Sequence, residues 1–252
     1  MRSFFAALGA CFLLFWAASV HAEALPKTFY KGVSFYEEGV YEKALDLFLS
    51  LYEKEGIQSG ALSYNIANTY MQLKETGRAM VWYERARAAM PGDPDLAFNR
   101  GVAFSKAKDL QEEKEGLLQR LLFFWKKGIS LLVLQKVAIG SGIFFWILGM
   151  FVLVRRHSAL KALLLFSGLF FAVVSSTALW DTICRRQSDE AVVLAPSVAV
   201  RSGLSESSTE LFTLHAGSFV RLEAFKGEWV RIAFGPDKRG WVASGAVEKI
   251  WP

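Results

Sequence analysis

The sequence predicts a multidomain membrane protein with an all-α repeat segment, two transmembrane helices and a small all-β barrel. Small and aromatic residues recur about every 35 positions over residues 25–110, a spacing typical of stacked helical repeats. Two apolar runs in the middle of the chain are each long enough to cross a bilayer. Short alternating stretches of apolar and polar residues, separated by turn residues, then fill 190–250.

The charges are segregated along the chain. The 252 residues are 53% hydrophobic and 21% charged, an average that suits neither a typical soluble protein nor a chain buried in lipid. Residues 23–128 carry 15 basic and 15 acidic side chains, and residues 188–252 carry 7 and 8, so the net charge of +5 belongs to the apolar runs and their edges. Because the basic residues flank apolar runs, we expect the lipid bilayer as a partner and no nucleic acid.

Residues 1–22 have the pattern of a secretory signal peptide. Arg2 supplies the positive start, residues 4–20 form an uncharged apolar run, and Val20-His21-Ala22 has the small-residue pattern of a cleavage site. We expect cleavage after Ala22. The alternative is an uncleaved anchor, because the run is just long enough to span a bilayer.

Two transmembrane helices are predicted over 129–154 and 159–180, joined by a short turn at 155–158. Lys136 lies near the start of the first run, where its long side chain can reach the head groups. The basic turn favours a cytoplasmic location, although basic residues also flank the outer ends of both runs. The signal peptide decides between these options, because it exports the segment that follows it. Both folded segments are therefore expected in the periplasm, anchored in a bacterial inner membrane.

The period in the first exported segment carries a specific pattern. The following residues recur 35 positions later: Gly32, Phe35, Ala44, Phe48 and Leu51 as Ala67, Tyr70, Ala79, Tyr83 and Ala86. Residues 64–70 recur again at 98–104. A small residue, an aromatic three positions later, then an alanine and another aromatic resembles the tetratricopeptide repeat family. In that pattern, small residues let the first helix of a pair press against the second.

The resemblance implies binding of peptides or proteins on a concave face lined by the first helix of each pair. The site residues expected on this face are Tyr36, Asn65, Asn68, Asn99 and Lys106. Asn65 and Asn99 hold the same repeat position, where related proteins hydrogen-bond an extended peptide backbone. The alternative for both is a helix-surface amide that faces water.

The third repeat is incomplete. It keeps its first helix, but Glu113 stands where the earlier repeats have Ala44 and Ala79. Because stacked repeats need a terminal cap, we expect residues 111–128 to form a degenerate amphipathic capping helix that leads into the first span.

The last segment predicts five or six short strands in about 60 residues. Val-Arg-Ser-Gly at 200–203, a tryptophan strand at Trp229 and Gly-Trp-Val at 240–242 resemble the bacterial SH3 family. Trp229 and Trp241 are candidates for an exposed aromatic groove that binds peptide or glycan. The alternative is that they fill the core of a very small domain.

The sequence contains none of the motifs for nucleophilic, phosphate-binding, dinucleotide, zinc-protease or calcium chemistry. Its three histidines lie in three different segments, and Cys184 follows an apolar run. We therefore expect no cofactor, no metal and no enzymatic activity.

The order of signal peptide, repeats, membrane hairpin and SH3-like segment resembles BatE-type proteins of the bacterial aerotolerance operon. The resemblance implies a membrane-bound scaffold in stress tolerance that works with von Willebrand A-domain membrane proteins. Only a few residues are expected in the cytoplasm, so direct docking of the MoxR-type ATPase of such operons is not expected. The alternatives are a peptidoglycan-binding module that recruits a wall enzyme, and an envelope sensor.

Overall fold

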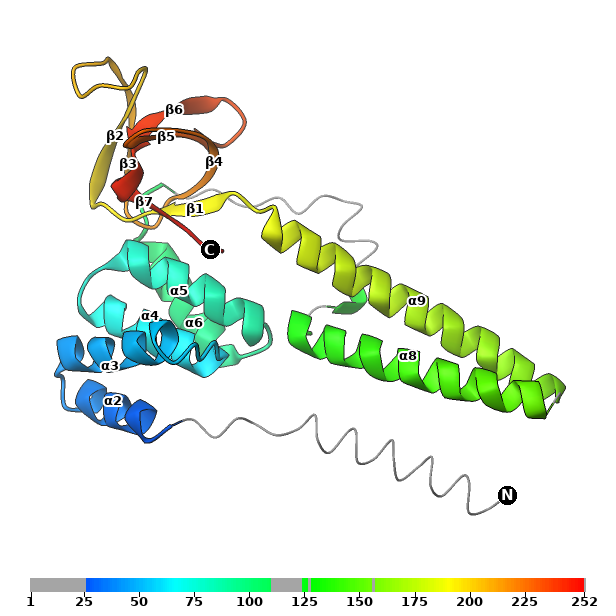
Figure 1. Cartoon of the computed structure of the whole chain (residues 1–252). Helices are drawn as coiled ribbons and strands as arrows, with labels where there is room; N and C mark the ends of the chain where they lie inside the picture. The colour runs from blue at the N-terminus through cyan, green and yellow to red at the C-terminus, as the bar shows by residue number, and fades with distance from the viewer. Residues whose placement is uncertain (1–25, 110–123, 127, 156, 252) are drawn as a thin grey trace. The chain divides into compact units, whose positions relative to one another are not determined.

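The computed structural model describes residues 26–109, 124–126, 128–155 and 157–251 (Figure 1). Within these ranges it contains seven α-helices and one antiparallel sheet of seven strands. The signal peptide predicted for 1–22 and most of the capping helix predicted for 111–128 lie outside the described residues. The chain divides into two units. One contains the helical hairpin of Leu131–Cys184, and the other combines the helices of Lys27–Ser130 with the sheet of Arg185–Pro252.

Five helices of the second unit follow one another: α2 (Lys27–Glu37), α3 (Tyr41–Glu53), α4 (Gly60–Gln72), α5 (Thr76–Ala89) and α6 (Pro94–Lys106). Local chemistry sets their ends. Gly39, with φ of 77°, follows α2, because glycine adopts this left-handed conformation without strain. The Ser59 hydroxyl accepts a hydrogen bond from Leu62 N, and the Asp93 carboxylate accepts one from Leu96 N, which caps α4 and α6. The chain therefore turns between α2 and α3 at Gly39 and begins α6 after Asp93.

Close helix contacts depend on the small residues of the 35-residue pattern. A Cβ placed on Gly32 would lie 2.5 Å from the ring of Phe48, so α2 approaches α3 closely only because this position is glycine. Ala67 and Tyr83, 35 residues further on, are likewise buried in the contacting helices α4 and α5. At Gly101 of α6, a Cβ would meet no described atom within 4 Å. The third small residue thus has no partner within the described part of the chain.

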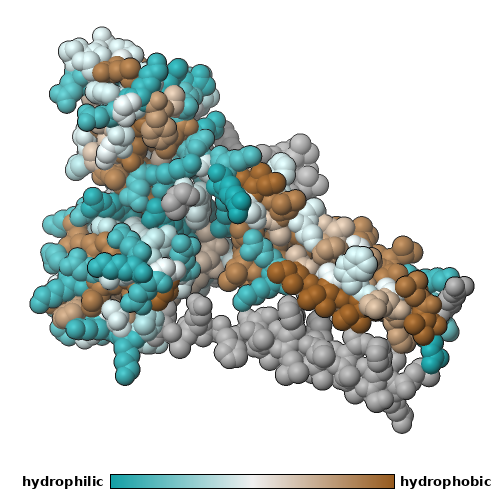
Figure 2. Space-filling model, viewed as in Figure 1, coloured by the Kyte–Doolittle hydropathy of each residue, from teal (hydrophilic) through white to brown (hydrophobic). Residues whose placement is uncertain are grey.

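The hairpin unit consists of α8 (Leu131–Val154) and α9 (Ser158–Arg186). Both helices are long and apolar enough to cross a membrane by length and composition, and their hydrophobic side chains appear as the brown surface along the hairpin (Figure 2). The first predicted span, 129–154, begins two residues before α8. The second, 159–180, ends six residues before the end of α9.

Glycines and phenylalanines pack α8 against α9. A Cβ on Gly142 would lie 2.8 Å from the Phe171 ring, and one on Gly168 would lie 2.9 Å from the Phe145 ring. The two phenylalanine rings stack with centroids 6.3 Å apart. Each ring therefore fills the space that a glycine leaves on the opposite helix.

The structure differs from the predicted continuous passage of the capping helix into the first span. Phe124–Lys126 form a single 3-10 turn, Gly128 has φ of 81°, and α8 begins only at Leu131. Because a residue in the left-handed region cannot continue a right-handed helix, the chain turns before α8.

The sheet contains β1 (Glu190–Val193), β2 (Ser197–Arg201), β3 (Glu210–His215), β4 (Phe219–Lys226), β5 (Trp229–Phe234), β6 (Lys238–Ala243) and β7 (Val247–Lys249). Its order is β3-β2-β6-β5-β4-β1-β7, and every pair is antiparallel. The all-β segment is confirmed, with seven strands instead of five or six. The ladder is open, with β3 and β7 at its edges, so the hydrogen bonds do not close it into the predicted barrel.

Alternation along the strands separates an apolar inner face from a polar outer face. Val230, Ile232 and Val242 are buried in the core of the sheet. Their neighbours Trp229 and Arg231 on β5 lie on the opposite face, as period-two alternation requires. The strands β1 and β7 are only four and three residues long, which explains why the sequence pattern did not reveal them separately.

Candidate functional site

The helices α2, α4 and α6 lie in succession, and side-chain hydrogen bonds link them. Gln72 on α4 donates to the Tyr36 hydroxyl on α2 at 3.3 Å, and Asn99 on α6 donates to the Tyr64 hydroxyl on α4 at 2.6 Å. All five helical site residues expected from the sequence lie on these three helices. We call the surface formed by α2, α4 and α6 the first-helix face.

Four side chains form a hydrogen-bonded group on this face, which we call the amide–tyrosine cluster: Tyr64, Asn68, Tyr83 and Asn99. The Tyr83 hydroxyl donates to Asn68 Oδ1 at 2.7 Å, and Asn99 Nδ2 donates to the same oxygen at 3.2 Å. Asn99 Nδ2 also reaches the Tyr64 hydroxyl. The cluster thus joins α4, α5 and α6 through side chains that are partly or fully buried.

The cluster leaves one donor group and one acceptor unengaged. Among the described residues, no hydrogen bond engages Asn68 Nδ2 or Asn99 Oδ1. An extended polypeptide presents carbonyl oxygens and N–H groups that match such a pair. The arrangement is therefore able to hydrogen-bond a backbone segment without disturbing the bonds inside the cluster.

Asn99 and Tyr83 together orient Asn68, because the Asn99 amide nitrogen can only donate and the Tyr83 hydroxyl donates to the same oxygen. Burial raises the pKa of the Tyr83 hydroxyl far above its ordinary value, and the neighbouring Tyr64 and Tyr36 raise it further. Tyr83 therefore remains a hydrogen-bond donor over the whole physiological pH range. Because it donates to Asn68 Oδ1, the Nδ2 group is the end of Asn68 that stays unengaged.

The structure brings Asn68, and not Asn65, to Asn99. Asn65 Nδ2 donates to the Ala61 carbonyl of its own helix at 2.9 Å, and its side chain is half-buried. Tyr36 is half-buried beside the ring of Tyr41, with centroids 5.5 Å apart. Lys106 is exposed at the end of α6. By spacing, Asn65 and Asn99 hold equivalent positions in successive repeats. Two residues at equivalent repeat positions need not contact each other across neighbouring helices.

Glu84 is a buried charge that the sequence reading missed. Its side chain is only 4% exposed, and its two carboxylate oxygens pair with Arg87 and Arg100. The spacing of Glu84 and Arg87 fits a pair within one helix. Arg100 comes from α6, and its contribution depends on how α5 and α6 pack. The group links α5 to α6, the helices that also carry Tyr83 and Asn99 of the amide–tyrosine cluster.

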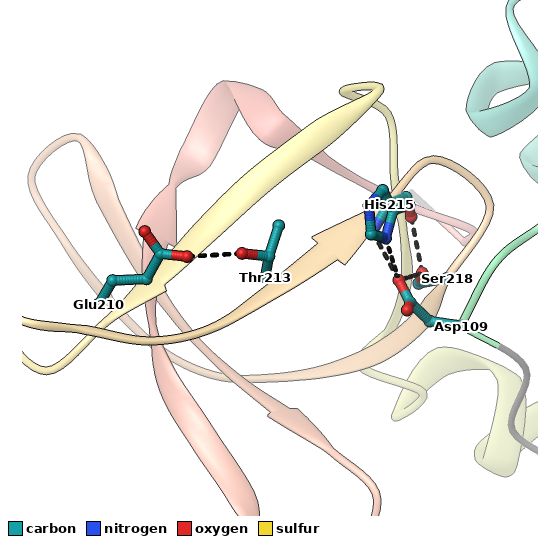
Figure 3. A network of polar contacts seen from close by, with 5 residues as sticks. All are labelled: Asp109, Glu210, Thr213, His215 and Ser218. Atoms are coloured by element: carbon teal, nitrogen blue, oxygen red, sulfur yellow. Dashed lines mark hydrogen bonds and ion pairs between the residues drawn. The ribbon is translucent and has the colours of Figure 1, made fainter.

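Asp109 connects the end of the helical part to the sheet (Figure 3). Its Oδ2 atom accepts hydrogen bonds from His215 N at 2.7 Å and from Ser218 Oγ at 3.0 Å, and lies 3.0 Å from His215 Nδ1. Desolvation acts to raise the pKa of Asp109, but hydrogen bonds from His215 and Ser218 outweigh it and lower the pKa below its ordinary value. Figure 3 also shows Thr213 donating to Glu210 within β3.

A second connection joins α5 to β7. Arg85 Nε donates to the Ile250 carbonyl at 2.9 Å, and its Nη2 lies 3.1 Å from the Glu248 carboxylate. The guanidinium lies over the Trp82 ring at 4.5 Å, and only 12% of the side chain is exposed. Ile250 and Glu248 are more than 160 residues from Arg85 in sequence, so no local pattern could have indicated these contacts. We call the contacts of Asp109 and Arg85 with the sheet the helix–sheet clasp.

Trp229 and Trp241 are both half-buried and do not belong to the buried core of the sheet. Arg231 is paired with Trp241 across β5 and β6, and Lys226 with Trp229 across β4 and β5. Lys226 Nζ lies 5.9 Å from the centre of the Trp241 ring. Both tryptophans therefore contribute to a surface that also carries basic side chains.

Within the described ranges, no group of three or more His, Cys, Asp or Glu side chains is arranged to hold a metal ion. Cys184 is exposed and not in a disulfide. The chain matches no protein-family model, and the search of curated proteins gave no match.

Proposed function

We propose that this chain is a membrane-anchored periplasmic scaffold that binds protein partners, as the resemblance to BatE-type proteins implies. In this proposal α2–α6 are tetratricopeptide repeats, the sheet is an SH3-like domain, and α8 and α9 anchor both in the bacterial inner membrane. The observation that carries the proposal is the amide–tyrosine cluster, because it holds an unengaged donor and an unengaged acceptor on the first-helix face.

An extended partner segment provides both complements to this pair. Asn68 Nδ2 donates to a partner carbonyl, and Asn99 Oδ1 accepts from a partner N–H. Tyr83 and Tyr64 hold the two amides in place before binding, so little conformational freedom is lost when the partner arrives. Each lost hydrogen bond at a buried interface costs about 1–3 kcal/mol, equivalent to roughly a tenfold change in affinity per 1.4 kcal/mol.

The helix–sheet clasp supports the scaffold role. Arg85 attaches the sheet to α5, and Asp109 attaches it to the segment that follows α6. Within the described part of the chain, no hydrogen bond joins the sheet to Asn68 or Asn99. The proposed binding face thus stays available while both folded parts remain connected. Because only a short turn faces the cytoplasm in this topology, partners are membrane or periplasmic proteins, and von Willebrand A-domain membrane proteins are the expected class. The chain has no catalytic role in this account.

A photocrosslinking experiment tests the proposal. A photoreactive amino acid replaces Val102, an exposed residue on α6 close to Asn99, in the full chain co-expressed with a von Willebrand A-domain membrane protein from the same genome. We expect a crosslink from this position and none from the same amino acid at Glu42, which is exposed on α3.

Asn68→Asp is the decisive variant for this experiment. It keeps the oxygen that accepts from Tyr83 and Asn99 but removes the unengaged donor, so the crosslink should fall about tenfold. Asn65→Asp introduces the same charge one turn away and should leave the crosslink unchanged. Equal crosslinking in wild type and Asn68→Asp, with both proteins folded, rejects the groove assignment.

Peptidoglycan binding is a second candidate function, favoured by the position of the half-buried Trp229 and Trp241 outside the core of the sheet. Aromatic rings with one exposed face can stack on sugars. The full chain in detergent should then cosediment with purified peptidoglycan, and Trp241→Ala should abolish this. Equal sedimentation of wild type and Trp241→Ala removes the candidate.

A further inference from the structure

The outer face of β4, β5 and β6 combines tryptophans with basic residues. Register pairs Trp229 with Lys226 and Ala243, and Arg231 with Trp241. Arg201 on β2 lies opposite Trp241, and Arg239 on β6 lies opposite Ala233. We call this surface the tryptophan–arginine face; its residues are Arg201, Glu223, Lys226, Trp229, Arg231, Arg239 and Trp241.

This face concentrates positive charge that the sheet segment as a whole lacks. Residues 190–250 contain equal numbers of basic and acidic side chains. With Arg221 of β4, which lies opposite Ala233, the surface carries five basic residues, against Glu223, Glu210 opposite Arg201 and Glu190 opposite Arg221. Glu223 pairs with Arg231 at 3.3 Å and Arg239 at 3.0 Å. One carboxylate cannot neutralise both guanidinium groups. Basic residues outnumber acidic ones by five to three on this surface. The surface is therefore complementary to an anionic partner.

The covalent connection to α9 limits where this face can act. The apolar run ends at Trp180, and the helix continues for six residues to Arg186, which adds about 9 Å. Three residues then lead to β1 at Glu190 and span at most about 11 Å. If α9 crosses the bilayer, the sheet starts within roughly 20 Å of the hydrocarbon edge. A tether of this length gives the sheet a high effective concentration at the head groups.

We infer that the tryptophan–arginine face binds the anionic head groups of the bilayer in which α9 is inserted. Basic side chains near a membrane surface gain attraction from anionic lipids, and tryptophan partitions into the interface between water and hydrocarbon. The inference rests on the proposed membrane insertion of α8 and α9. It favours a lipid surface over peptidoglycan because the charge and the short tether both point to head groups.

Site-specific fluorescence quenching tests the inference on the full chain reconstituted in lipid vesicles. In a background of Cys11→Ser and Cys184→Ser, an environment-sensitive dye is attached to a cysteine at Ala243, which is exposed on this face opposite Trp229, or at Ser207 in the β2–β3 loop. The vesicles contain a lipid with a quencher on its head group and either phosphatidylglycerol or only phosphatidylcholine.

We expect at least threefold stronger quenching at position 243 than at 207 in phosphatidylglycerol vesicles. The difference should disappear in phosphatidylcholine and at about 0.5 M salt, where charges are screened within a few ångströms. It should also disappear in the combined variant Lys226→Gln, Arg231→Gln and Arg239→Gln. The matched control Lys31→Gln, Lys43→Gln and Lys54→Gln removes the same charge from exposed helix positions and should keep the difference.

A dye at position 146, which is exposed on α8, separates this inference from the membrane proposal. Quenching at 146 by acyl-chain quenchers together with equal signals at 243 and 207 rejects the face and retains the membrane anchor. No quenching at 146 rejects both. A change at 243 that requires added peptidoglycan fragments, and not phosphatidylglycerol, also overturns the inference and identifies the wall as the partner.

Discussion

Asn99 connects α6 to α4 through a single amide nitrogen, which donates to Tyr64 and to Asn68. Asn99→Ala leaves the Tyr64 hydroxyl and one lone pair of Asn68 without this donor, in a partly buried setting. We therefore expect the free energy of unfolding to fall by about 1–3 kcal/mol. Urea unfolding of the purified chain in detergent, followed by far-ultraviolet circular dichroism, measures this loss.

Asn65→Ala is the matched control for that substitution. Among the described residues, Asn65 Nδ2 donates only to the Ala61 carbonyl, which can also accept a backbone hydrogen bond within its own helix. The expected loss is therefore within about 0.5 kcal/mol. Equal destabilisation by the two substitutions contradicts the assignment of Asn99, and not Asn65, to the cluster.

Gly240 shows how one missing side chain lets two strands approach. A Cβ there would lie 2.5 Å from Val200 Cγ1 and 2.8 Å from the Arg201 carbonyl oxygen, and the backbone oxygen cannot move aside freely. Gly240→Ala should lower the free energy of unfolding by about 1–3 kcal/mol. Gly245→Ala meets no atom within 4 Å and should change it by less than about 0.5 kcal/mol. Thermal unfolding followed by tryptophan fluorescence compares the two, and similar melting temperatures would argue against the close β2–β6 contact.

At the scale of elements, the clasp at Asp109 makes the contact between the helices and the sheet depend on pH. The pKa of Asp109 is lowered by its bonds to His215 and Ser218, so the ionised carboxylate stabilises the folded state. This contribution is complete well above the ordinary aspartate pKa of about 3.9 and is lost as the pH falls through the lower folded-state value.

Asp109→Asn removes this ionisation. We expect the variant to be less stable than wild type at pH 7, with a difference that shrinks as the pH falls below about 4. Urea midpoints measured between pH 7 and about pH 2.5 report the difference. A difference that stays constant over this range shows that the carboxylate charge does not hold the clasp.

Local spacing predicted the elements better than their neighbours. The 35-residue pattern identified Gly32 and Phe48, because a small residue and an aromatic ring must face each other wherever two helices cross closely. The contact between Asn68 and Asn99 depends on the rotation of α6 against α4, which no local pattern encodes. The turn at Gly128 and the short strands β1 and β7 were also missed, because each involves very few residues.

At the scale of the whole molecule, the sequence predicted the order of helical segment, apolar hairpin and sheet, because each has its own period and composition. It did not predict that Arg85 and Asp109 attach the sheet to the helices. Such contacts join residues more than 100 positions apart and arise only from the folded arrangement. The scaffold proposal depends on this arrangement, since both folded parts must lie on the same side of the membrane to form the clasp.

Reporter fusions to the full chain measure that requirement most directly. An enzyme active only in the periplasm is fused after Lys108, within the 155–158 turn, or after Pro252. The account predicts activity after Lys108 and after Pro252 and none at the turn, because α8 and α9 cross the membrane as a hairpin. Activity at the turn with silence at both other positions would contradict the periplasmic assignment, and activity at only one of the two would contradict the shared side that the clasp requires.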